Sequence, residues 1–215
     1  MFNEGQVMNY VLLAVIWILW CIIHSILISA GLTNYFKEKL AGRYKYYRLS
    51  YNLISLLTLF PVLFYSYGLN GPLVFRWEGG FIPIQFLLFM IAMILFYTGA
   101  RKYDLLQFLG IRQIQSGKLS VGLSESGKID MTGIHGIIRH PWYTGSILFV
   151  WVINKNIYLS TFIICMVLTW YLIIGAWLEE KKLIGQCGNH YRDYQKQVSM
   201  LLPLKWFVRF FKKVK

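Results

Sequence analysis

Long apolar stretches restrict the folds open to this chain more than any other feature. Residues 7–30 are almost wholly apolar, and a helix needs about 20 residues to cross the hydrocarbon core of a bilayer. Similar stretches follow at 49–69, 81–99, 142–153 and 158–178. Because backbone groups inside lipid must bond to one another, such stretches form helices. We therefore predict an all-α, polytopic membrane protein with five transmembrane helices.

The composition agrees with a bilayer setting. Of the 215 residues, 57% are hydrophobic and only 14% are charged, whereas about a quarter of the residues in soluble domains are charged. The first apolar stretch follows the acidic lead MFNEGQ, is too long for a signal peptide and ends without a small-x-small cleavage site. No repeat and no Pro/Gly/Ser-rich linker divides the chain. We therefore predict a single integral-membrane domain over residues 1–215.

The distribution of basic residues predicts the orientation. A net charge of +13 is typical of proteins that bind nucleic acid, but here the basic residues lie between apolar stretches and not on one soluble face. The loops at 32–48 and 101–139 and the segment after residue 178 hold twenty of the twenty-two Lys and Arg residues. Five helices place all three segments on one side, which the positive-inside rule assigns to the cytoplasm. We predict an outside N-terminus, a cytoplasmic C-terminus and no nucleic-acid partner, in a bacterial inner membrane.

The last two apolar stretches predict a helical hairpin, because only residues 154–156 join them. Arg139 and His140 precede the first of these helices, and Glu179 and Glu180 follow the second. In an antiparallel pair, the start of one helix and the end of the other lie at the same end. The two clusters, about forty residues apart in sequence, are therefore predicted to be neighbours in space.

The chemistry of these clusters fits two interpretations. Pro141 suits the first turn of a helix, and the helix start together with Arg139 favours an anion. The carboxylates could accept hydrogen bonds from hydroxyls or an ammonium group, so a zwitterionic, sugar-bearing ligand such as S-adenosylmethionine would fit. A salt bridge between Arg139 and Glu179 or Glu180 that merely holds the hairpin together fits equally well. Clusters sealed together without room for a nucleoside, or placed on opposite leaflets, would rule out a donor-binding pocket and an enzyme built on it.

The motif RHPWYTG at 139–145, followed by a Glu pair, a glycine, Tyr-x-x-Tyr and a proline, resembles the integral-membrane methyltransferases. That family includes isoprenylcysteine carboxyl methyltransferase and phospholipid N-methyltransferases. The resemblance implies that S-adenosylmethionine binds to a cytoplasmic region formed by 101–141 and 179–203. His135 and Gly136, just upstream of the motif, either cap this site or face water. The residues that match are Arg139, His140, Pro141, Tyr143, Gly145, Glu179, Glu180, Gly188, Tyr191, Tyr194 and Pro203.

One departure from the family pattern is Ser199-Met200-Leu201, where the family often has a Val-Pro turn. It puts the geometry of the tail in question. Further resemblances lie in the N-terminal half: HS at 24–25, YRLSYN at 47–52 and YDLLQFLGIRQ at 103–113 resemble the NnrU-like branch, which includes methanethiol S-methyltransferases. This branch implies a small thiol as methyl acceptor, first of all methanethiol, which would become dimethyl sulfide.

Other functions remain open on the sequence alone. The acceptor could instead be an isoprenylcysteine carboxylate or a lipid amine. A reading from another class is a non-catalytic membrane subunit or a small-molecule transporter, which would not bind S-adenosylmethionine. The sequence does not indicate an oligomeric state.

Methyl transfer needs a nucleophile placed in line about 3 Å from the methyl carbon, and a thiol attacks as thiolate. A nearby base or cation would help, and a histidine in a membrane helix is a functional hypothesis by default. His24 could equally form a hydrogen bond to Tyr51 within the bundle. Arg112 could bind lipid phosphate, and a surface ion pair would explain Asp104. The candidate catalytic residues are His24, Arg48, Asp104 and Arg112.

Neither a metal site nor a disulfide is predicted. Cys21, Cys165 and Cys187 are far apart, and no HxxxH or HExxH spacing occurs. The tail LKWFVRFFKKVK at 204–215 alternates basic and aromatic residues, a pattern typical of a helix that lies on an anionic membrane surface. Membrane lipids are therefore expected partners.

Overall fold

The chain is mainly helical and divides into two compact units. The computed structural model describes residues 3–101, 106, 109–116 and 131–214. The first unit comprises 1–76, 103–120 and 156–167, and the second comprises 77–102, 121–155 and 168–215. Helix α8 (Leu159–Cys187) begins in the first unit and continues in the second. The prediction of a single domain stays a prediction.

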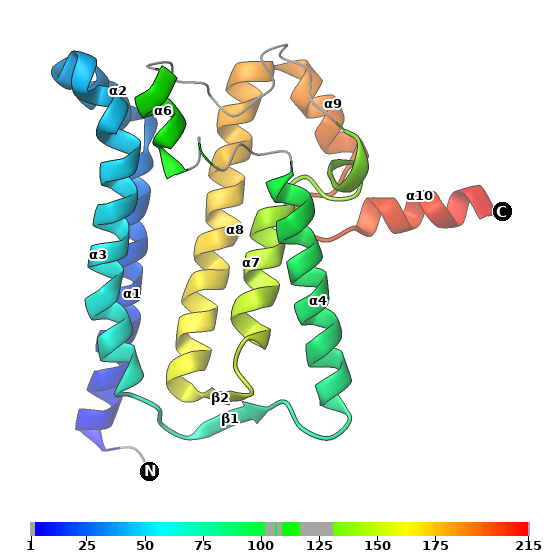
Figure 1. The fold of residues 1–215 in the computed structure, drawn as a ribbon. Coiled ribbons are helices and arrows are strands. Elements are labelled where there is room, and N and C mark those ends of the chain that lie inside the picture. Colours follow the sequence, from blue (N-terminus) through cyan, green and yellow to red (C-terminus); the bar gives the residue numbers. More distant parts are fainter. Residues whose placement is uncertain (1–2, 102–105, 107–108, 117–130, 215) are drawn as a thin grey trace. The chain divides into compact units, whose positions relative to one another are not determined.

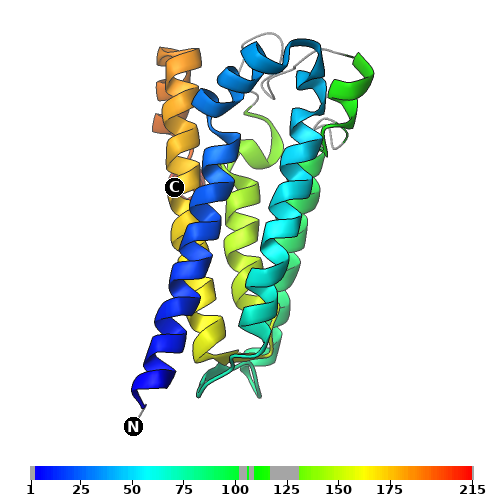
Figure 2. The ribbon, with the colours of Figure 1, turned by 90° about the vertical axis from the view of Figure 1, so that its left-hand side faces the viewer.

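Helices α1 (Glu4–Ile28) and α3 (Tyr47–Tyr67) pack side by side in the first unit (Figure 1, Figure 2). Asn3 caps α1 in a capping box with Gln6, which satisfies backbone donors that a helix start leaves open. Between the two helices, the indole of Trp17 donates to the Ser66 hydroxyl at 3.0 Å. The apolar stretches predicted at 7–30 and 49–69 are therefore helices with boundaries shifted by two or three residues.

The segment 32–48, predicted as a loop, is helical, so this prediction is wrong. It contains α2 (Ala30–Leu40) and the 3-10 helix η1 (Ala41–Tyr46), which leads directly into α3. The side chain of Ser29 accepts a hydrogen bond from the Leu32 amide and so starts α2 where α1 ends. A basic segment between apolar stretches can therefore be helical, because lysine is a good helix former.

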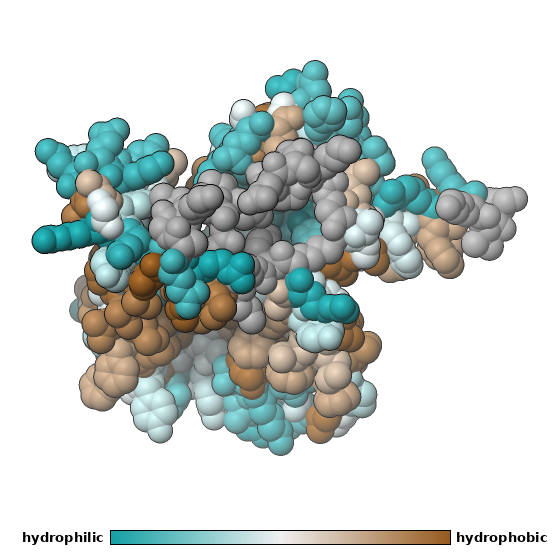
Figure 3. Space-filling view, turned by 45° about the horizontal axis from the view of Figure 1, so that its top comes forward, coloured by the Kyte–Doolittle hydropathy of each residue, from teal (hydrophilic) through white to brown (hydrophobic). Residues whose placement is uncertain are grey.

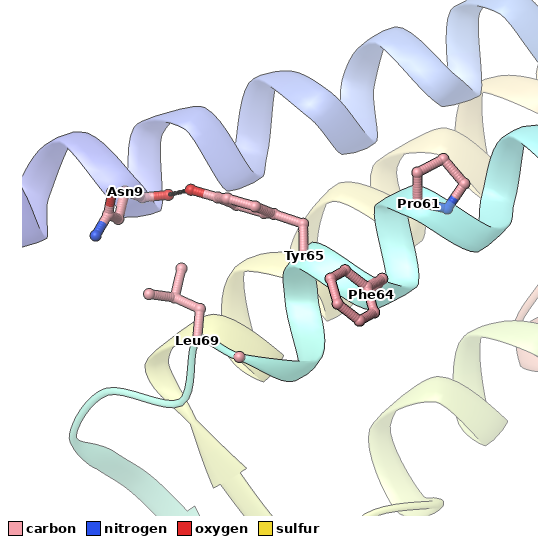
Figure 4. A pocket seen from close by; sticks show the side chains of 6 residues that line it. Asn9, Pro61, Phe64, Tyr65 and Leu69 are labelled. Atoms are coloured by element: carbon pink, nitrogen blue, oxygen red, sulfur yellow. Dashed lines mark hydrogen bonds between the residues drawn. The ribbon is translucent and has the colours of Figure 1, made fainter.

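A shallow pocket lies between α1 and α3 near the end of α3 (Figure 4). The hydroxyl of Tyr65 donates to the backbone carbonyl of Asn9 across it at 3.4 Å. The other side chains that line it are apolar, namely Pro61, Phe64 and Leu69. It has no charged lining residue that would recognise an ionic cofactor.

A two-stranded antiparallel ribbon follows α3. Strand β1 (Leu73–Arg76) pairs with β2 (Asn156–Tyr158), with Leu73 opposite Tyr158 and Arg76 opposite Asn156. The Arg76 guanidinium also donates to the Asn156 side chain at 3.0 Å. This ribbon corrects the all-α prediction in detail: strands of three and four residues are too short to show the period-two pattern that identifies a strand.

Two helices pack closely in the second unit, α4 (Phe81–Ala100) and α7 (Pro141–Val152). Gly145 makes the approach possible, because a Cβ placed there would lie 3.3 Å from the Ala92 carbonyl oxygen and from Leu95. The Trp142 ring fills the space beside Gly99 in the same way. The glycine of the RHPWYTG motif thus has a packing role in this contact.

The remaining part of α8 also contacts α7. The Trp151 indole donates to the Thr169 hydroxyl at 3.0 Å near one end of α7, and Tyr143 near the other end lies against Gly175. Helix α8 ends at Cys187 and not at residue 178, so the predicted end of the last helix is wrong by more than two turns. Helix α9 (Asn189–Gln197) follows Gly188, and α10 (Leu204–Val214) ends the described chain.

Four stretches in the described part of the chain are long and apolar enough to cross a membrane: α1, the continuous run Ala30–Tyr67, α4 and α8. The protein is therefore a multi-pass membrane protein. Helix α7 has twelve residues, about 18 Å of helix, which is short of a hydrocarbon core of about 30 Å. Five spans and their orientation stay a prediction.

Hydrophilic residues form several patches in the view of Figure 3, including one at its lower edge. Figure 3 shows them on α2 in the first unit and on the end of α8 with α9 in the second, while hydrophobic residues cover the helix flanks in view. Large apolar side chains such as Leu57, Phe60 and Phe64 are exposed along α3. An apolar surface of this extent marks contact with lipid or with another protein.

Candidate functional site

Residues 138–140 lie beside residues 199–200 in the second unit just before α7 begins. Ile138 and Ser199 form a parallel bridge. The Arg139 amide donates to the Ser199 carbonyl at 2.9 Å, and the His140 amide donates to the Met200 carbonyl at 3.1 Å. These bonds fix the backbone of the motif, and they occur at the residues where the sequence departs from the family pattern.

The carboxylate of Glu180 is the centre of a buried ionic cluster. Both Nε and Nη2 of Arg139 lie 2.6 Å from its Oε1. Two residues of α9 add to it, since the Tyr191 hydroxyl donates to Oε1 at 3.4 Å and the Gln195 amide donates to Oε2 at 2.8 Å. The two clusters that the hairpin argument expected to be neighbours therefore meet through Arg139 and Glu180.

The guanidinium of Arg139 is engaged on its other side as well. Its Nη1 donates to the backbone carbonyls of Gln195, at 3.3 Å, and Val198. The side chains of Arg139 and Glu180 are each only 7% exposed. A buried ion pair recovers its desolvation cost only when further hydrogen bonds satisfy both partners, and here they do. For these two residues the structure therefore has the salt bridge that the sequence allowed, with most of their hydrogen-bonding capacity used inside the protein.

His140 lies between the two glutamates. Its Nε2 is 3.2 Å from Glu180 Oε1, and its Nδ1 is 3.8 Å from Glu179 Oε2. The Tyr143 ring meets the imidazole edge-on with 5.4 Å between the ring centres. The Glu179 side chain is 38% exposed, whereas the Glu180 side chain is nearly covered. Of the pair, Glu179 is therefore the carboxylate that can accept hydrogen bonds from a ligand.

Helix α9 forms a small core against the end of α8. Tyr191, Tyr194 and Val198 are buried there. The Tyr194 hydroxyl donates to the His135 carbonyl at 2.6 Å, which ties down the 3-10 helix η2 (Gly133–Gly136). Burial and, next, the Glu180 carboxylate raise the pKa of Tyr191 well above the ordinary tyrosine value. The Tyr191 hydroxyl therefore stays protonated and remains a hydrogen-bond donor to Glu180.

The start of α7 has the expected geometry. Pro141 occupies a first-turn position, where its missing N–H costs nothing. Thr144 joins this turn to the tail, because its hydroxyl contacts the carbonyls of His140 at 3.1 Å and Leu201 at 2.9 Å. Segments at 139–144 and 195–201 are thus connected by side-chain and backbone bonds, which holds the ionic cluster in one arrangement.

The candidate catalytic residues that the structure describes, His24, Arg48 and Arg112, lie in the first unit. His24 Nε2 is 2.7 Å from the Tyr51 hydroxyl, and Nδ1 is 3.1 Å from the Ser55 hydroxyl. The imidazole also stacks on Trp20 with 5.0 Å between the ring centres. The contact with Tyr51 that the sequence allowed is present, and the catalytic role of His24 stays a prediction.

Arg48 is half-buried at the start of α3, and Arg112 is exposed in α6 (Ile111–Ser116). Gly110, with φ +91°, lies against Arg48 and Leu49, where any Cβ would come within 3.0 Å of the backbone or the Arg48 side chain. The Asn52 amide donates to the Leu109 carbonyl at 3.1 Å. The FLGIRQ motif is thus held against α3 in the described residues, and Asp104 lies outside them.

Sequence reasoning missed Gln195 and Ser55. Gln195 donates to Glu180, and its backbone carbonyl accepts from Arg139. A signal existed, because Gln195 is four residues after Tyr191 and so on the same face of α9. Ser55 is likewise four residues after Tyr51 on α3. Within the described residues no group of three or more His, Cys, Asp or Glu side chains could hold a metal ion.

The apolar helices and the Arg139–Glu180 cluster define a multi-pass membrane protein with a buried ion pair. The ion pair lies where the short helix α7 begins, beside the end of the long helix α8. Residues 12–208 match the family described as NnrU protein. Because that match covers most of the chain, the protein belongs to this family.

The chain is also similar to curated proteins named methanethiol S-methyltransferase. It is 39% identical over 70 residues to the one from Pseudomonas deceptionensis, which covers 33% of this chain and 26% of that protein. It is 24% identical over 204 residues to the one from Mycobacterium tuberculosis, which covers 94% of this chain and 79% of that protein. The match to the Pseudomonas relative thus spans about a quarter of its length (26%). No solved structure matches the chain.

Proposed function

We propose that this protein is a membrane-embedded methyltransferase that uses S-adenosylmethionine to methylate a small thiol, first of all methanethiol to dimethyl sulfide. The observation that carries the proposal is the similarity along 94% of the chain to a protein named methanethiol S-methyltransferase. The meeting of the RHP motif with the Glu179–Glu180 pair supports it, because it gathers the residues that the family resemblance assigns to the donor.

The residues present fit such a donor in part. Glu179 offers a partly exposed carboxylate beside His140, which suits the hydroxyls or the ammonium group of S-adenosylmethionine. Arg139 and Glu180 are satisfied by one another and by α9, so we assign them the task of holding His140 and Glu179 in place. When bound, S-adenosylmethionine supplies an activated methyl group, and the protein's contribution is to position the thiolate in line and to exclude water.

The finer topology belongs to the same proposal. We infer five transmembrane helices with α7 and α8 as an antiparallel hairpin, an outside N-terminus and a cytoplasmic C-terminus in a bacterial inner membrane. Contacts near both ends of α7 support the hairpin, since Trp151 bonds to Thr169 and His140 approaches Glu180. The basic residues after α8 support the cytoplasmic placement of the site.

The direct test is calorimetric titration of the purified protein with S-adenosylmethionine, compared with Glu179→Gln. Loss of a hydrogen bond to a charged group costs about 1.5–3 kcal/mol, so we expect affinity to fall roughly tenfold or more. Glu38→Gln is the matched control, because Glu38 is an exposed carboxylate on α2, and its affinity should equal that of the wild type. Absence of saturable binding by the wild type would overturn the methyltransferase proposal.

The acceptor is tested separately by turnover. Purified protein is supplied with S-adenosylmethionine and either methanethiol or a prenylcysteine analogue, and the methylated product is measured. We expect dimethyl sulfide from methanethiol. Product from the prenyl compound alone would overturn the thiol assignment and leave the donor assignment standing.

A further inference from the structure

Helix α10 has two chemically distinct faces. Leu204, Phe207, Val208 and Phe211 follow one another at spacings of three, four and seven, the spacing of one helix face, and Phe211 is 64% exposed. Lys205, Arg209 and Lys212, at spacings of four and seven, lie together on a different face of the helix. The helix is thus strongly amphipathic, with an aromatic face and a basic face.

Two residues of the basic face, Lys205 and Arg209, contact the rest of the second unit. The Lys205 ammonium donates to the Gln195 carbonyl at 2.6 Å, and the Arg209 guanidinium donates to the Gly136 carbonyl at 3.0 Å. The Lys205 amide also donates to the Ser199 hydroxyl at 2.9 Å. The aromatic face takes no part in these contacts, and all four of its side chains are exposed. The sequence analysis predicted a helix that lies on an anionic membrane surface, and the structure adds that Lys205 and Arg209 bond to protein carbonyls.

The place of α10 along the unit fits a bilayer surface. The helix follows Pro203, and Met200 just before it bonds to His140, the residue that precedes α7. Figure 1 shows α10 extending sideways from the unit at the level where α7 begins. The apolar part of α7 and the polar cluster meet at this level. A helix with an apolar face at such a boundary lies in the plane of the membrane surface.

We propose that α10 is an in-plane anchor that seats its aromatic face in an anionic lipid bilayer and, through Arg209 and Lys205, holds η2 and the end of α9 in place. The lipid surface thereby tightens the donor site, because Gly136 and Gln195 belong to the segments that surround Arg139, His140 and Glu180. The anchor stands on the contacts above. Its effect on donor affinity rests on the proposed function.

Lipid is the occupant that the charges favour. Helices α4 and α8 are long and apolar enough to cross a membrane, so a bilayer borders α10. Lys212, exposed beside the aromatic face, complements anionic headgroups. If a second copy of α10 packed on the aromatic face, the basic residues of the two helices would lie near each other, and their like charges would repel.

Spin labels test the seating of α10 in the full chain. Phe211→Cys and Lys212→Cys are each labelled in a Cys187→Ser background, because Cys21 and Cys165 are buried, and placed in nanodiscs of phosphatidylcholine with phosphatidylglycerol. We expect the label at 211 to be reached by oxygen, which partitions into lipid, and the label at 212 by a water-soluble nickel complex. Access of the nickel complex to both labels would overturn the anchor. Shielding of both labels from both reagents would overturn it in favour of a protein partner.

Hydrogen exchange tests whether the seating of α10 in lipid holds η2 in place, and this test does not depend on activity. Phe207→Glu combined with Phe211→Glu should release α10 from lipid, and amide exchange over 131–138 should rise. Phe207→Leu with Phe211→Leu keeps the face apolar and is the control, with exchange as in the wild type. Arg209→Ala should leave the spin-label pattern unchanged but still raise exchange over 131–138. Unchanged exchange in the doubly charged variant or in Arg209→Ala would overturn the coupling.

The affinity for S-adenosylmethionine completes the test. We expect it to fall roughly tenfold in the doubly charged variant and in Arg209→Ala, since both leave the binding segments less organised. An unchanged affinity alongside raised exchange would overturn the effect on the donor site. If the wild type itself binds no S-adenosylmethionine while exchange responds as expected, the proposed function fails and the anchor stands.

Discussion

The two units place polar groups on apolar helices in different ways. In the first unit, His24 bonds to Tyr51 and Ser55, and all three side chains come from α1 and α3. In the second unit, Glu180 is held by residues from the segment before α7 and from α9. The first cluster consists of an imidazole and hydroxyls, and the second is built on a full ion pair.

The difference reflects what each kind of group needs when it is buried. Imidazole and hydroxyl groups both donate and accept, so two neighbouring helices are enough to satisfy them. A buried carboxylate and guanidinium lose far more hydration and need several partners each. The ionic cluster therefore depends on segments that are far apart in sequence, and the neutral cluster depends on a single helix pair. Breaking one should have consequences that breaking the other does not.

The largest effect is expected from Glu180→Ala. It leaves the Arg139 guanidinium buried without its carboxylate, and such a loss costs about 3–5 kcal/mol. Thermal unfolding of the reconstituted protein should show a large drop in the midpoint, with increased amide exchange in α9. Glu179→Ala is the control with a small effect, because that side chain is 38% exposed. Equal destabilisation by the two variants would contradict the assignment of Glu180 as the centre of the buried ionic cluster.

A smaller effect is expected from His24→Ala, which leaves the Tyr51 and Ser55 hydroxyls without the imidazole. Each hydrogen bond lost costs about 0.5–1.5 kcal/mol. The unfolding midpoint should fall moderately while affinity for S-adenosylmethionine stays as in the wild type. Turnover reduced by orders of magnitude with an unchanged midpoint would show that His24 is catalytic and not structural.

Gln195→Ala should weaken the ionic cluster without dismantling it. Glu180 Oε2 loses the amide at 2.8 Å, but Arg139 keeps its bonds to Oε1 and to the two backbone carbonyls. We expect a loss of about 1 kcal/mol, measured by chemical unfolding. A loss as large as that of Glu180→Ala would mean that the ion pair cannot hold without α9.

The smallest effect is expected from Tyr191→Phe. Its hydrogen bond of 3.4 Å is long, so the loss near neutral pH should be about 0.5 kcal/mol. Since the fold raises the pKa of Tyr191, the unfolded chain ionises first, near pH 10. The contribution of the Tyr191 hydroxyl to the free energy of unfolding is therefore fully present below about pH 10 and decreases as the pH rises further. Melting curves above that pH should fall less steeply for the variant than for the wild type, and parallel curves would contradict the argument.

Local hydrophobicity made most of the helices predictable. The predicted stretch 81–99 is α4 at Phe81–Ala100, and 142–153 is α7 at Pro141–Val152, because apolar composition is a property of consecutive residues. The helical segment α2 and the short ribbon were missed. Their residues carry no long apolar run, so hydrophobicity does not reveal them; α2 is started by the Ser29 cap, and the ribbon forms by pairing of segments far apart in sequence.

The sequence by itself determined that this is a multi-pass helical membrane protein and that the RHP motif and the Glu179–Glu180 pair are the residues of interest. Only the tertiary structure decided how the pair divides: Glu180 is enclosed by Arg139, Tyr191 and Gln195, and Glu179 is left partly open. Adjacent residues on a helix point in different directions, so which of them is buried depends on what packs against that face. The same reason applies to α10, whose basic face is defined by the sequence but whose direction is set by the carbonyls that it meets.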